Sequence, residues 1–211
     1  DSTYYEGSKY NYSFRLLHDM ASRISLAGGD LAFVDLLDTF FGYAADPISA
    51  PGVSPSRAEM AEGELLGRFE GFNNEPDMES PYAYIYAGRH DRACEVIRAG
   101  LNQCYGDSRG GLVGNDDSGG MSSWYVWSAL GLFPVAGQDV FLIGSPIFEQ
   151  AKVQFGPEQP FTIETSSSES EGPYVRTVSL NGKPHTSPFL CWNELCSGGT
   201  LSIEMTSDPT V

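Results

Sequence analysis

The sequence predicts a mainly α-helical chain that ends in a small antiparallel β region. Up to about residue 133, apolar residues recur at helical spacing, and glycine, proline or polar runs separate one such segment from the next. After Pro134 the pattern changes to short runs rich in Val, Ile, Phe and Thr, which is typical of strands. We therefore expect a helical part over residues 1–134 and a β-rich segment over residues 135–211.

Five helices are expected in the first part. They are expected from about Phe14 to Gly28-Gly29, from Asp30 to about Gly42, from about Pro81, over residues 90–103 and over about 121–131. Asp30 is a candidate N-cap for the second helix. Residues 44–58 and 106–120 are expected to be loops because glycine, proline, serine and aspartate dominate them, and residues 59–72 favour no single structure.

Five short strands are expected in the second part, separated by turn residues. They are expected at residues 140–143, 153–155, 161–164, 177–180 and 201–205. Asn181-Gly182 is the strongest local signal, because this dipeptide favours the two-residue turn of a β-hairpin.

The composition excludes several classes of protein. The 211 residues include 12 Lys+Arg and 28 Asp+Glu, which gives a net charge of −16. A chain this acidic would repel a phosphate backbone, so we do not expect it to bind nucleic acid. The longest apolar run is far short of the roughly 20 residues that span a bilayer. A hydrophobic content of 41% predicts a folded core, and the excess acid indicates at first only a well-solvated surface.

The four cysteines form neither a CxxC pair nor a zinc-binding pattern. Cys191 and Cys196 could close a short loop as a disulfide. Cys94 and Cys104 lie on or near one expected helix, so their pairing would require the helix to end between them. Four free thiols remain the alternative.

A glutamate among tyrosines precedes the first helix. Glu6 lies in the run from Tyr4 to Tyr12, which contains four tyrosines. It could be an ordinary first-turn acid favoured by the helix dipole. Alternatively, aromatic surroundings could raise its pKa and make it a general acid, and aromatic rings also stack on sugars.

A second polar stretch precedes the expected helix at Pro81. Three acids and two amides lie within seven residues, among them Asn74, Glu75 and Glu79. Such oxygen ligands suit Ca²⁺ or sugar hydroxyls. The alternative is a polar loop in which Asp77 or a nearby serine caps the next helix.

A third stretch, from Gly110 to Tyr125, contains the adjacent acids Asp116 and Asp117 after Asn115. Adjacent carboxylates repel, which favours a base or a bound cation, and the glycines permit close approach of a ligand. The alternative is ordinary capping of the following helix by Asp117 or Ser118.

Together these stretches resemble glycoside hydrolase family 92, the calcium-dependent exo-acting α-mannosidases. The matching residues keep one order along the chain: Tyr5-Glu6-Gly7-Ser8, Tyr10, Tyr12, Gly28-Gly29, Asn74-Glu75-Pro76, Pro81-Tyr82, Tyr86-Ala87-Gly88, Gly114-Asn115-Asp116-Asp117-Ser118-Gly119, Met121-Ser122, Trp124-Tyr125, Ala129-Leu130-Gly131, Phe133-Pro134-Val135 and Gly144-Ser145-Pro146. The combination is specific, although no single short piece would be.

The resemblance implies the C-terminal part of an (α/α)₆ toroid over residues 1–134, with residues 135–211 packed on it. A missing N-terminal β-sandwich domain and the first toroid helices would complete the enzyme. It also implies an inverting mechanism in which Glu6 is the general acid and Asp117 the general base, with the two carboxyls about 6.5–9.5 Å apart. In the family a Ca²⁺ contacts sugar hydroxyls, and Asn74 and Glu75 are the candidate ligands or sugar contacts.

The chain departs from the family pattern at two places. Family members often carry a second acid two residues before the base, where this chain has Asn115, so Asp116 is the candidate for the supporting role. Many members have a His-His pair after Asn-Glu-Pro, where this chain has Met78-Glu79. Because that segment helps to set what lies beyond the cleaved bond, Glu79 is a candidate substrate contact, and Asn115 is another candidate substrate contact.

The resemblance thus predicts calcium-assisted hydrolysis of terminal α-linked mannose, with an α-1,2 linkage expected, from N-glycans or mannan. Some relatives carry Gln in place of the acid and cleave mannose-1-phosphate linkages, whereas this chain has Glu6. A non-catalytic carbohydrate-binding fragment and an enzyme of another (α/α)₆ family are the alternatives. We expect the 211 residues alone to be inactive, and the enzyme to be secreted, periplasmic or attached to the cell surface.

Overall fold

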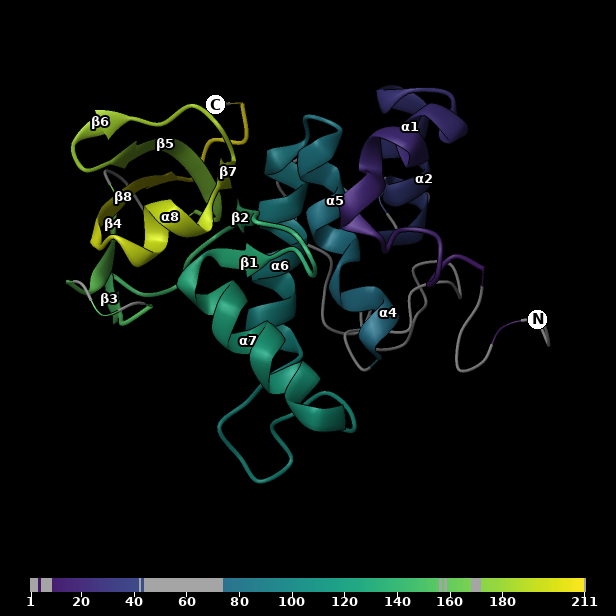
Figure 1. Ribbon diagram of the computed structural model, residues 1–211. Helices are drawn as coiled ribbons and strands as arrows, with labels where there is room; N and C mark the ends of the chain where they lie inside the picture. The colour runs from purple at the N-terminus through teal and green to yellow at the C-terminus, as the bar shows by residue number, and fades with distance from the viewer. Residues whose placement is uncertain are drawn as a thin grey trace. The chain divides into compact units, whose positions relative to one another are not determined.

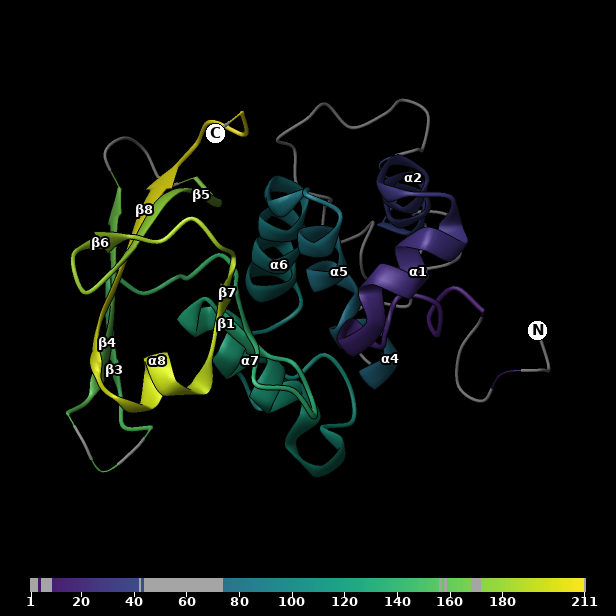
Figure 2. The same ribbon diagram turned by 45° about the horizontal axis from the view of Figure 1, so that its top comes forward.

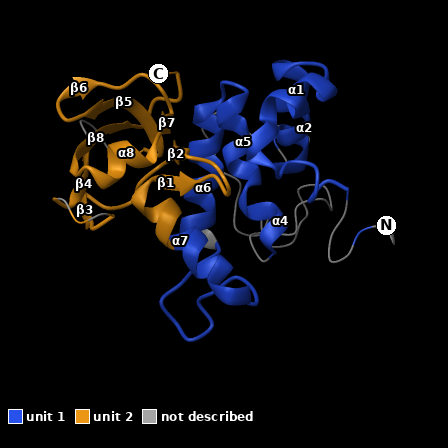
Figure 3. Cartoon of the chain, viewed as in Figure 1, with its two compact units in different colours: residues 1–125 blue, residues 126–211 orange. Residues whose placement is uncertain are grey.

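A computed structural model gives the fold. It describes residues 4, 9–41, 43, 74–155, 157, 159–167 and 172–210. Glu6 and the predictions for residues 44–58 and 59–72 lie outside these ranges. The chain divides into two compact units, unit 1 from Asp1 to Tyr125 and unit 2 from Val126 to Val211 (Figure 3). Helices occupy unit 1 and strands dominate unit 2, so the predicted change from helix to strand is confirmed.

The described helices of unit 1 agree with the sequence prediction, with two additions. They are η1 (Leu17–Asp19), α1 (Met20–Ala27), α2 (Asp30–Phe41), α4 (Glu75–Met78), α5 (Ser80–Tyr86), α6 (His90–Gln103), η2 (Asp117–Gly119) and α7 (Gly120–Leu130), which continues into unit 2. The additions are α4, because the polar composition of its stretch favoured a loop, and η2, which lies within the loop expected over residues 106–120. Asp30 is the first residue of α2, and the carbonyl of Gly29 accepts the hydrogen bond from Phe33 N. Figure 1 shows α1 beside α2 and α5 beside α6.

Aromatic side chains fill the core of unit 1. Phe14 packs against Phe33 and Phe40, with ring centroids 5.9 and 5.1 Å apart, and all three are buried. Phe41 and Tyr84 continue this packing from α2 to α5, with centroids 5.8 Å apart. Offset and edge-on ring pairs add to the stabilisation from burial alone. The cluster therefore anchors the segment before η1 to α2 and α5.

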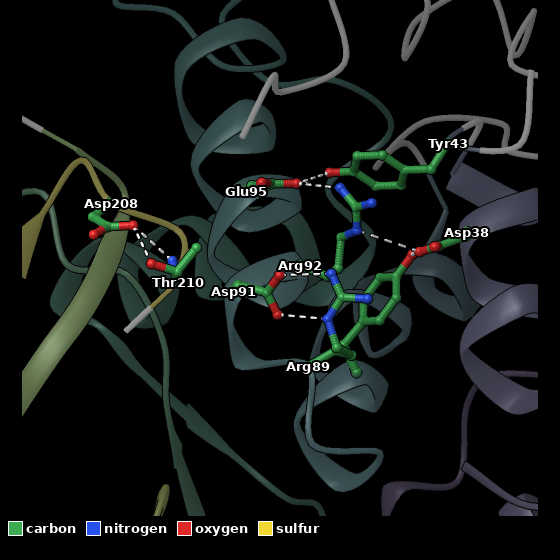
Figure 4. Close-up of polar contacts among 9 residues, drawn as sticks. Asp38, Tyr43, Arg89, Asp91, Arg92, Glu95, Asp208 and Thr210 are labelled. Carbon is green, nitrogen blue, oxygen red and sulfur yellow. Dashed lines mark hydrogen bonds and ion pairs between the residues drawn. The ribbon is translucent and has the colours of Figure 1, made fainter. Parts of the chain in front are cut away.

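A buried polar network joins α2 to α6 (Figure 4). Arg92 is 7% exposed, and its Nη1 donates to Glu95 Oε2 at 3.0 Å. Its Nε lies 3.6 Å from Asp38 Oδ1, and its guanidinium lies 3.7 Å from the centroid of the Tyr43 ring. The Tyr43 hydroxyl donates to Glu95 Oε2 at 2.5 Å, and that of Tyr84 donates to Asp38 at 2.8 Å. Buried charges are thereby paired, as their desolvation requires.

The strands of unit 2 form two sheets. The first has the order β1 (Leu132–Pro134), β2 (Phe141–Ile143), β7 (Phe189–Leu190). The second has the order β3 (Gln150–Val153), β4 (Phe161–Ser167), β8 (Gly199–Thr206), β5 (Tyr174–Leu180), β6 (Lys183–Pro184). Figure 2 shows β3, β4 and β8 running together, and the short helix α8 (Trp192–Cys196) precedes β8. The sequence pattern did not predict β1, β7 or α8, and it placed β3 three residues too late.

The expectation of purely antiparallel strands is wrong for one pair. Strand β8 pairs in parallel with β4, from Phe161 opposite Gly199 to Ser167 opposite Met205. Parallel pairing needs a crossover of a dozen or more residues, and the β5–β6 hairpin and α8 supply it. The hairpin prediction is confirmed, because Leu180 pairs with Lys183 across Asn181 and Gly182, and both turn residues have positive φ.

The core of unit 2 contains Leu132, Phe141, Ile143, Phe161, Ile163, Leu190, Leu195, Leu201, Ile203 and Met205. None of the four cysteines, all of which are described, forms a disulfide bond. Cys191 is the N-cap of α8 and Cys196 is its last residue, and the two do not close a disulfide loop. Within the described ranges, no helix combines the length and the hydropathy needed to cross a membrane.

Candidate active site

Asn74 and Glu75 lie at the first turn of α4. Asn74 has an extended backbone, and its Oδ1 accepts a hydrogen bond from Glu75 N at 3.1 Å, so it caps the helix. Pro76 follows within the first turn, where the missing N–H has no intrahelical partner to lose. The cap and the proline fix the direction in which Glu75 leaves the backbone.

The Glu75 carboxylate faces the start of α7. A Cβ built on Gly120 would lie 3.7 Å from both Oε1 and Cγ of Glu75. Glu75 Oε1 is buried and has no hydrogen-bond partner among the described residues. An unpaired buried carboxylate oxygen is strongly unfavourable. The site therefore offers one oxygen ligand to a cation, a water molecule or a hydroxyl group.

Asp116 is the residue that caps α7. Its two carboxylate oxygens accept hydrogen bonds from Ser122 N and Ser122 Oγ, both at 2.8 Å. These bonds to the Ser122 backbone and side chain lower the pKa of Asp116 below its usual value. The backbone carbonyl of Asp116 also accepts from Gly119 N and Gly120 N. The sequence allowed Asp117 or Ser118 as the cap, and the structure gives this role to Asp116.

Asp117 is consequently left outside the helix cap, and its side chain is exposed. Its φ is 27°, and the following Ser118 has φ 59°, so two consecutive non-glycine residues have positive φ. Such strain persists only where surrounding contacts impose it, and it is frequent at functional sites. Asn115 Nδ2 donates to Asp117 Oδ1 at 2.8 Å. This hydrogen bond orients the carboxylate and leaves Asp117 Oδ2 available to another donor.

Glu79, a predicted substrate contact, supports the backbone of a distant residue. Its Oε2 accepts a hydrogen bond from Leu16 N at 2.8 Å, where Leu16 has the left-handed φ of 75°. Burial and the neighbouring Glu79 charge together raise the pKa of Tyr86 to about 12. Glu79 therefore holds the chain just before η1, and Oε1 is its remaining oxygen for a ligand.

Two buried contacts at α4 were missed by sequence reasoning. Asn11 Nδ2 donates to both carboxylate oxygens of Asp77, at 3.1 and 3.0 Å, and both residues are at most 1% exposed. Trp124 Nε1 donates to the carbonyl of Met78 at 2.9 Å. Asn11 lies in the tyrosine-rich stretch and Asp77 in the polar stretch, but no sequence signal links positions 66 residues apart.

The contacts of Glu75 and Trp124 bring the polar stretch beside the loop that carries Asp117. Asp117 could accept a proton, and Glu75 could bind a cation or a hydroxyl group, with Asn74 next to it. Within the described ranges, no three His, Cys, Asp or Glu side chains are grouped to hold a metal ion. Glu75 and Asn74 could thus supply only part of a coordination shell, and Ca²⁺ takes 6–8 oxygens, including carbonyls, waters and ligand hydroxyls.

Comparison with known proteins gives the family. The model of the glycosyl hydrolase family 92 catalytic domain matches residues 1–207. An uncharacterized secreted glycosidase of Arthroderma benhamiae is 29% identical over 208 residues, which are 95% of this chain and 23% of that protein. The chain thus spans about a quarter of the length of such a relative.

Solved structures agree with this match. A family GH92 inverting mannosidase of Bacteroides thetaiotaomicron superimposes with a TM-score of 0.78 and 28% identity, over 97% of this chain and 28% of that one. A family GH92 α-mannosidase of the same bacterium, in complex with mannoimidazole, gives a TM-score of 0.74 and 27% identity, over 96% of this chain and 26% of that one. Because the family model covers nearly every residue, the chain belongs to glycosyl hydrolase family 92.

Proposed function

We propose that this chain carries part of the catalytic site of an exo-α-mannosidase that removes terminal α-linked mannose with inversion. The observation that carries the proposal is the likeness in sequence and structure to two mannosidases over at least 96% of the chain. The contact of Glu75 with Gly120, three residues after Asp117, supports it independently, because the geometry puts two carboxylate-bearing segments side by side.

The proposed mechanism needs two carboxyl groups with different tasks. Glu6 protonates the departing glycosidic oxygen, and Asp117 removes a proton from the water that attacks the opposite face of the sugar. Asp117 suits the role of base because it is exposed and leaves the capping of α7 to Asp116. Asn115 holds Asp117 Oδ1 and so directs Oδ2 toward the attacking water. Asp116 supports the base by fixing the loop from which it projects.

Calcium is the proposed cofactor, and the residues present fit it in part. The unpaired Oε1 of Glu75 is a carboxylate ligand of the kind that Ca²⁺ prefers, and the amide oxygen of Asn74, which caps α4, lies on the preceding residue. When bound, the cation would hold sugar hydroxyls and favour distortion of the ring. Glu75 and Asn74 would then fix the sugar beside Asp117, which deprotonates the water.

The proposed substrates are mannose-containing glycans, either N-glycans or mannan, and the proposed linkage is α-1,2. Glu6 favours an ordinary α-mannoside over a mannose-1-phosphate linkage, because only the former needs a proton on its leaving group. Glu79 Oε1 is the proposed contact beyond the cleaved bond, and Asn115 is a further proposed substrate contact. An extracytoplasmic location follows from this substrate class, and the Arthroderma benhamiae relative is named as secreted.

The proposed architecture places this chain within a larger catalytic domain. Residues 1–134 would belong to an (α/α)₆ toroid, and residues 135–211 to a β-rich segment packed on it. The rest of the toroid and a further N-terminal domain would complete the pocket. We therefore expect the 211 residues alone to release no mannose, whereas the intact protein that contains them does.

The decisive experiment measures hydrolysis of α-1,2-mannobiose by the intact protein and its variants. We expect Asp117→Asn to lower kcat by about 10²–10⁴-fold, which is the usual contribution of a general base. Asp116→Asn is the matched control, because it removes an adjacent charge but leaves an acceptor for Ser122, and its kcat should fall less than tenfold. NMR of the first product should show β-mannose. Full activity in Asp117→Asn would refute the assignment of the base.

The general acid has its own test. Glu6→Gln should abolish hydrolysis of mannobiose but retain cleavage of an aryl mannoside whose leaving group needs no proton. Equal losses on both substrates would contradict the proposed role of Glu6.

Chelation should abolish mannobiose hydrolysis and added Ca²⁺ should restore it. Activity that persists after exhaustive chelation would exclude calcium from the mechanism.

A further inference from the structure

A buried amide–carboxylate pair joins the tyrosine-rich segment to α4. Asp77 is fully buried, and the single amide nitrogen of Asn11, which is 1% exposed, lies 3.1 and 3.0 Å from its two oxygens. A carboxylate loses several kcal/mol of hydration free energy when it is buried, so burial is tolerated only where hydrogen-bond donors contact its oxygens. The pair therefore fixes one orientation of the α4 turn.

A second buried contact holds the same turn, from a residue that follows it in the sequence. The indole of Trp124, 2% exposed, donates from Nε1 to the carbonyl of Met78 at 2.9 Å. Tyr105 stacks on this indole, with ring centroids 5.7 Å apart and planes within 10°, and donates its hydroxyl to Met121 O at 3.2 Å. The side chain of Trp124 can thus rotate little, so its hydrogen bond to Met78 holds the start of α7 against α4.

From these contacts we infer that Asn11 and Asp77 are positioning residues for Glu75. Asp77 lies two residues after Glu75 in a helix of one turn, so the backbone of Glu75 cannot shift without moving Asp77. Trp124 sets the distance between α4 and α7, and Asn11–Asp77 sets the rotation of α4. Together these contacts keep Glu75 Oε1 next to Gly120, the first residue of α7. Asp117 lies three residues before Gly120.

This role rests on the proposed function, because the oxygen held in place is the one assigned to Ca²⁺. Partners that orient a metal ligand typically change metal affinity by 10–100-fold when they are removed. A displacement of about 1 Å in a reacting group can lower turnover by about 10²-fold. A merely structural pair would lower thermal stability without changing either quantity in the folded protein.

The experiment uses four variants of the intact protein: Asn11→Ala, Asn11→Asp, Asp77→Asn and the double variant Asn11→Asp/Asp77→Asn. Ca²⁺ affinity is measured by titration calorimetry, and kcat and KM with mannobiose at saturating Ca²⁺. We expect Asn11→Ala to weaken Ca²⁺ binding by about 10–100-fold. Asn11→Asp should be worse, because it opposes two buried carboxylates. The double variant exchanges donor and acceptor and should regain at least tenfold in affinity over Asn11→Asp.

Val34→Ala is the control for stability alone, because Val34 is buried in α2 and belongs to no part of the site. It should lower the melting temperature and leave Ca²⁺ affinity and kcat unchanged. Unchanged affinity in folded Asn11→Ala, or no recovery in the double variant, would overturn the positioning role. Calorimetry also separates the two proposals, because weakened Ca²⁺ binding without any mannose release would refute only the proposed reaction.

Discussion

Replacing Arg92 with methionine should destabilise the helical unit strongly, because it removes the cation from a buried network. Arg92 is 7% exposed and donates to Glu95, whose side chain is 1% exposed, at 3.0 Å. Asp38 and the Tyr43 ring contact the same guanidinium. Burial would lower the pKa of Arg92, but the surrounding Tyr43, Asp38 and Glu95 outweigh it and raise this pKa. Arg92 is thus held in its charged form.

The size of the effect follows from this burial. Removing one partner of a buried ion pair costs about 3–5 kcal/mol, because the remaining carboxylate stays buried without its counter-charge. Methionine replaces the stem of Arg92, so the loss of packing is small. Because whole domains are stable by only about 5–15 kcal/mol, such a loss should lower the denaturant midpoint markedly.

Arg89→Met is the matched control. Arg89 forms two hydrogen bonds with Asp91 at 2.8 and 2.6 Å, but its side chain is 35% exposed. An exposed pair contributes about 0–1 kcal/mol. The assay is urea unfolding of the intact protein, monitored by its tryptophan fluorescence. If Arg92→Met lost less than about 1 kcal/mol, or no more than Arg89→Met, the reasoning from burial would be refuted.

Three further predictions concern single positions. Burial raises the pKa of Asp38 above its ordinary value of 3.8. Just above pH 3.8 the folded state therefore binds more protons than the unfolded state, so the free energy of unfolding should fall as pH rises. Asp38→Asn should remove this slope when unfolding is measured as a function of pH. Gly131→Ala should lower the temperature of thermal unfolding more than Gly137→Ala. Both glycines have positive φ, but only at Gly131 would the new Cβ meet a ring, that of Pro146, at 2.6 Å. Glu79→Ala should speed amide exchange at Leu16, whereas Glu79→Gln should not; equal exchange in both would contradict the observed hydrogen bond.

Local patterns predicted most of the elements, because helix periodicity and turn chemistry act over a few residues. The span 90–103 was predicted for α6 and found as His90–Gln103, and Asn181-Gly182 forms the expected hairpin. The short elements escaped prediction. The turn of α4 has four residues and depends on the Asn74 cap, while β1 and β7 have too few residues for an alternating pattern.

The candidate site divides in the same way. The motifs around Asn74-Glu75 and Asp116-Asp117 were visible in the sequence because each is contiguous. Which of Asp116 and Asp117 caps α7 was not visible, because either aspartate can cap a helix. The geometry decided it by giving Ser122 to Asp116 and a positive φ to Asp117.

The sequence by itself determined that the chain is helical first and strand-rich later, that it is acidic, and that it resembles glycoside hydrolase family 92. The tertiary structure alone decided that β8 runs parallel to β4, that Asn11 meets Asp77, and that Trp124 holds α4. These contacts join residues far apart in the chain. Their free energy comes from burial and hydrogen bonding that exist only after the segments pack, so no local pattern records them.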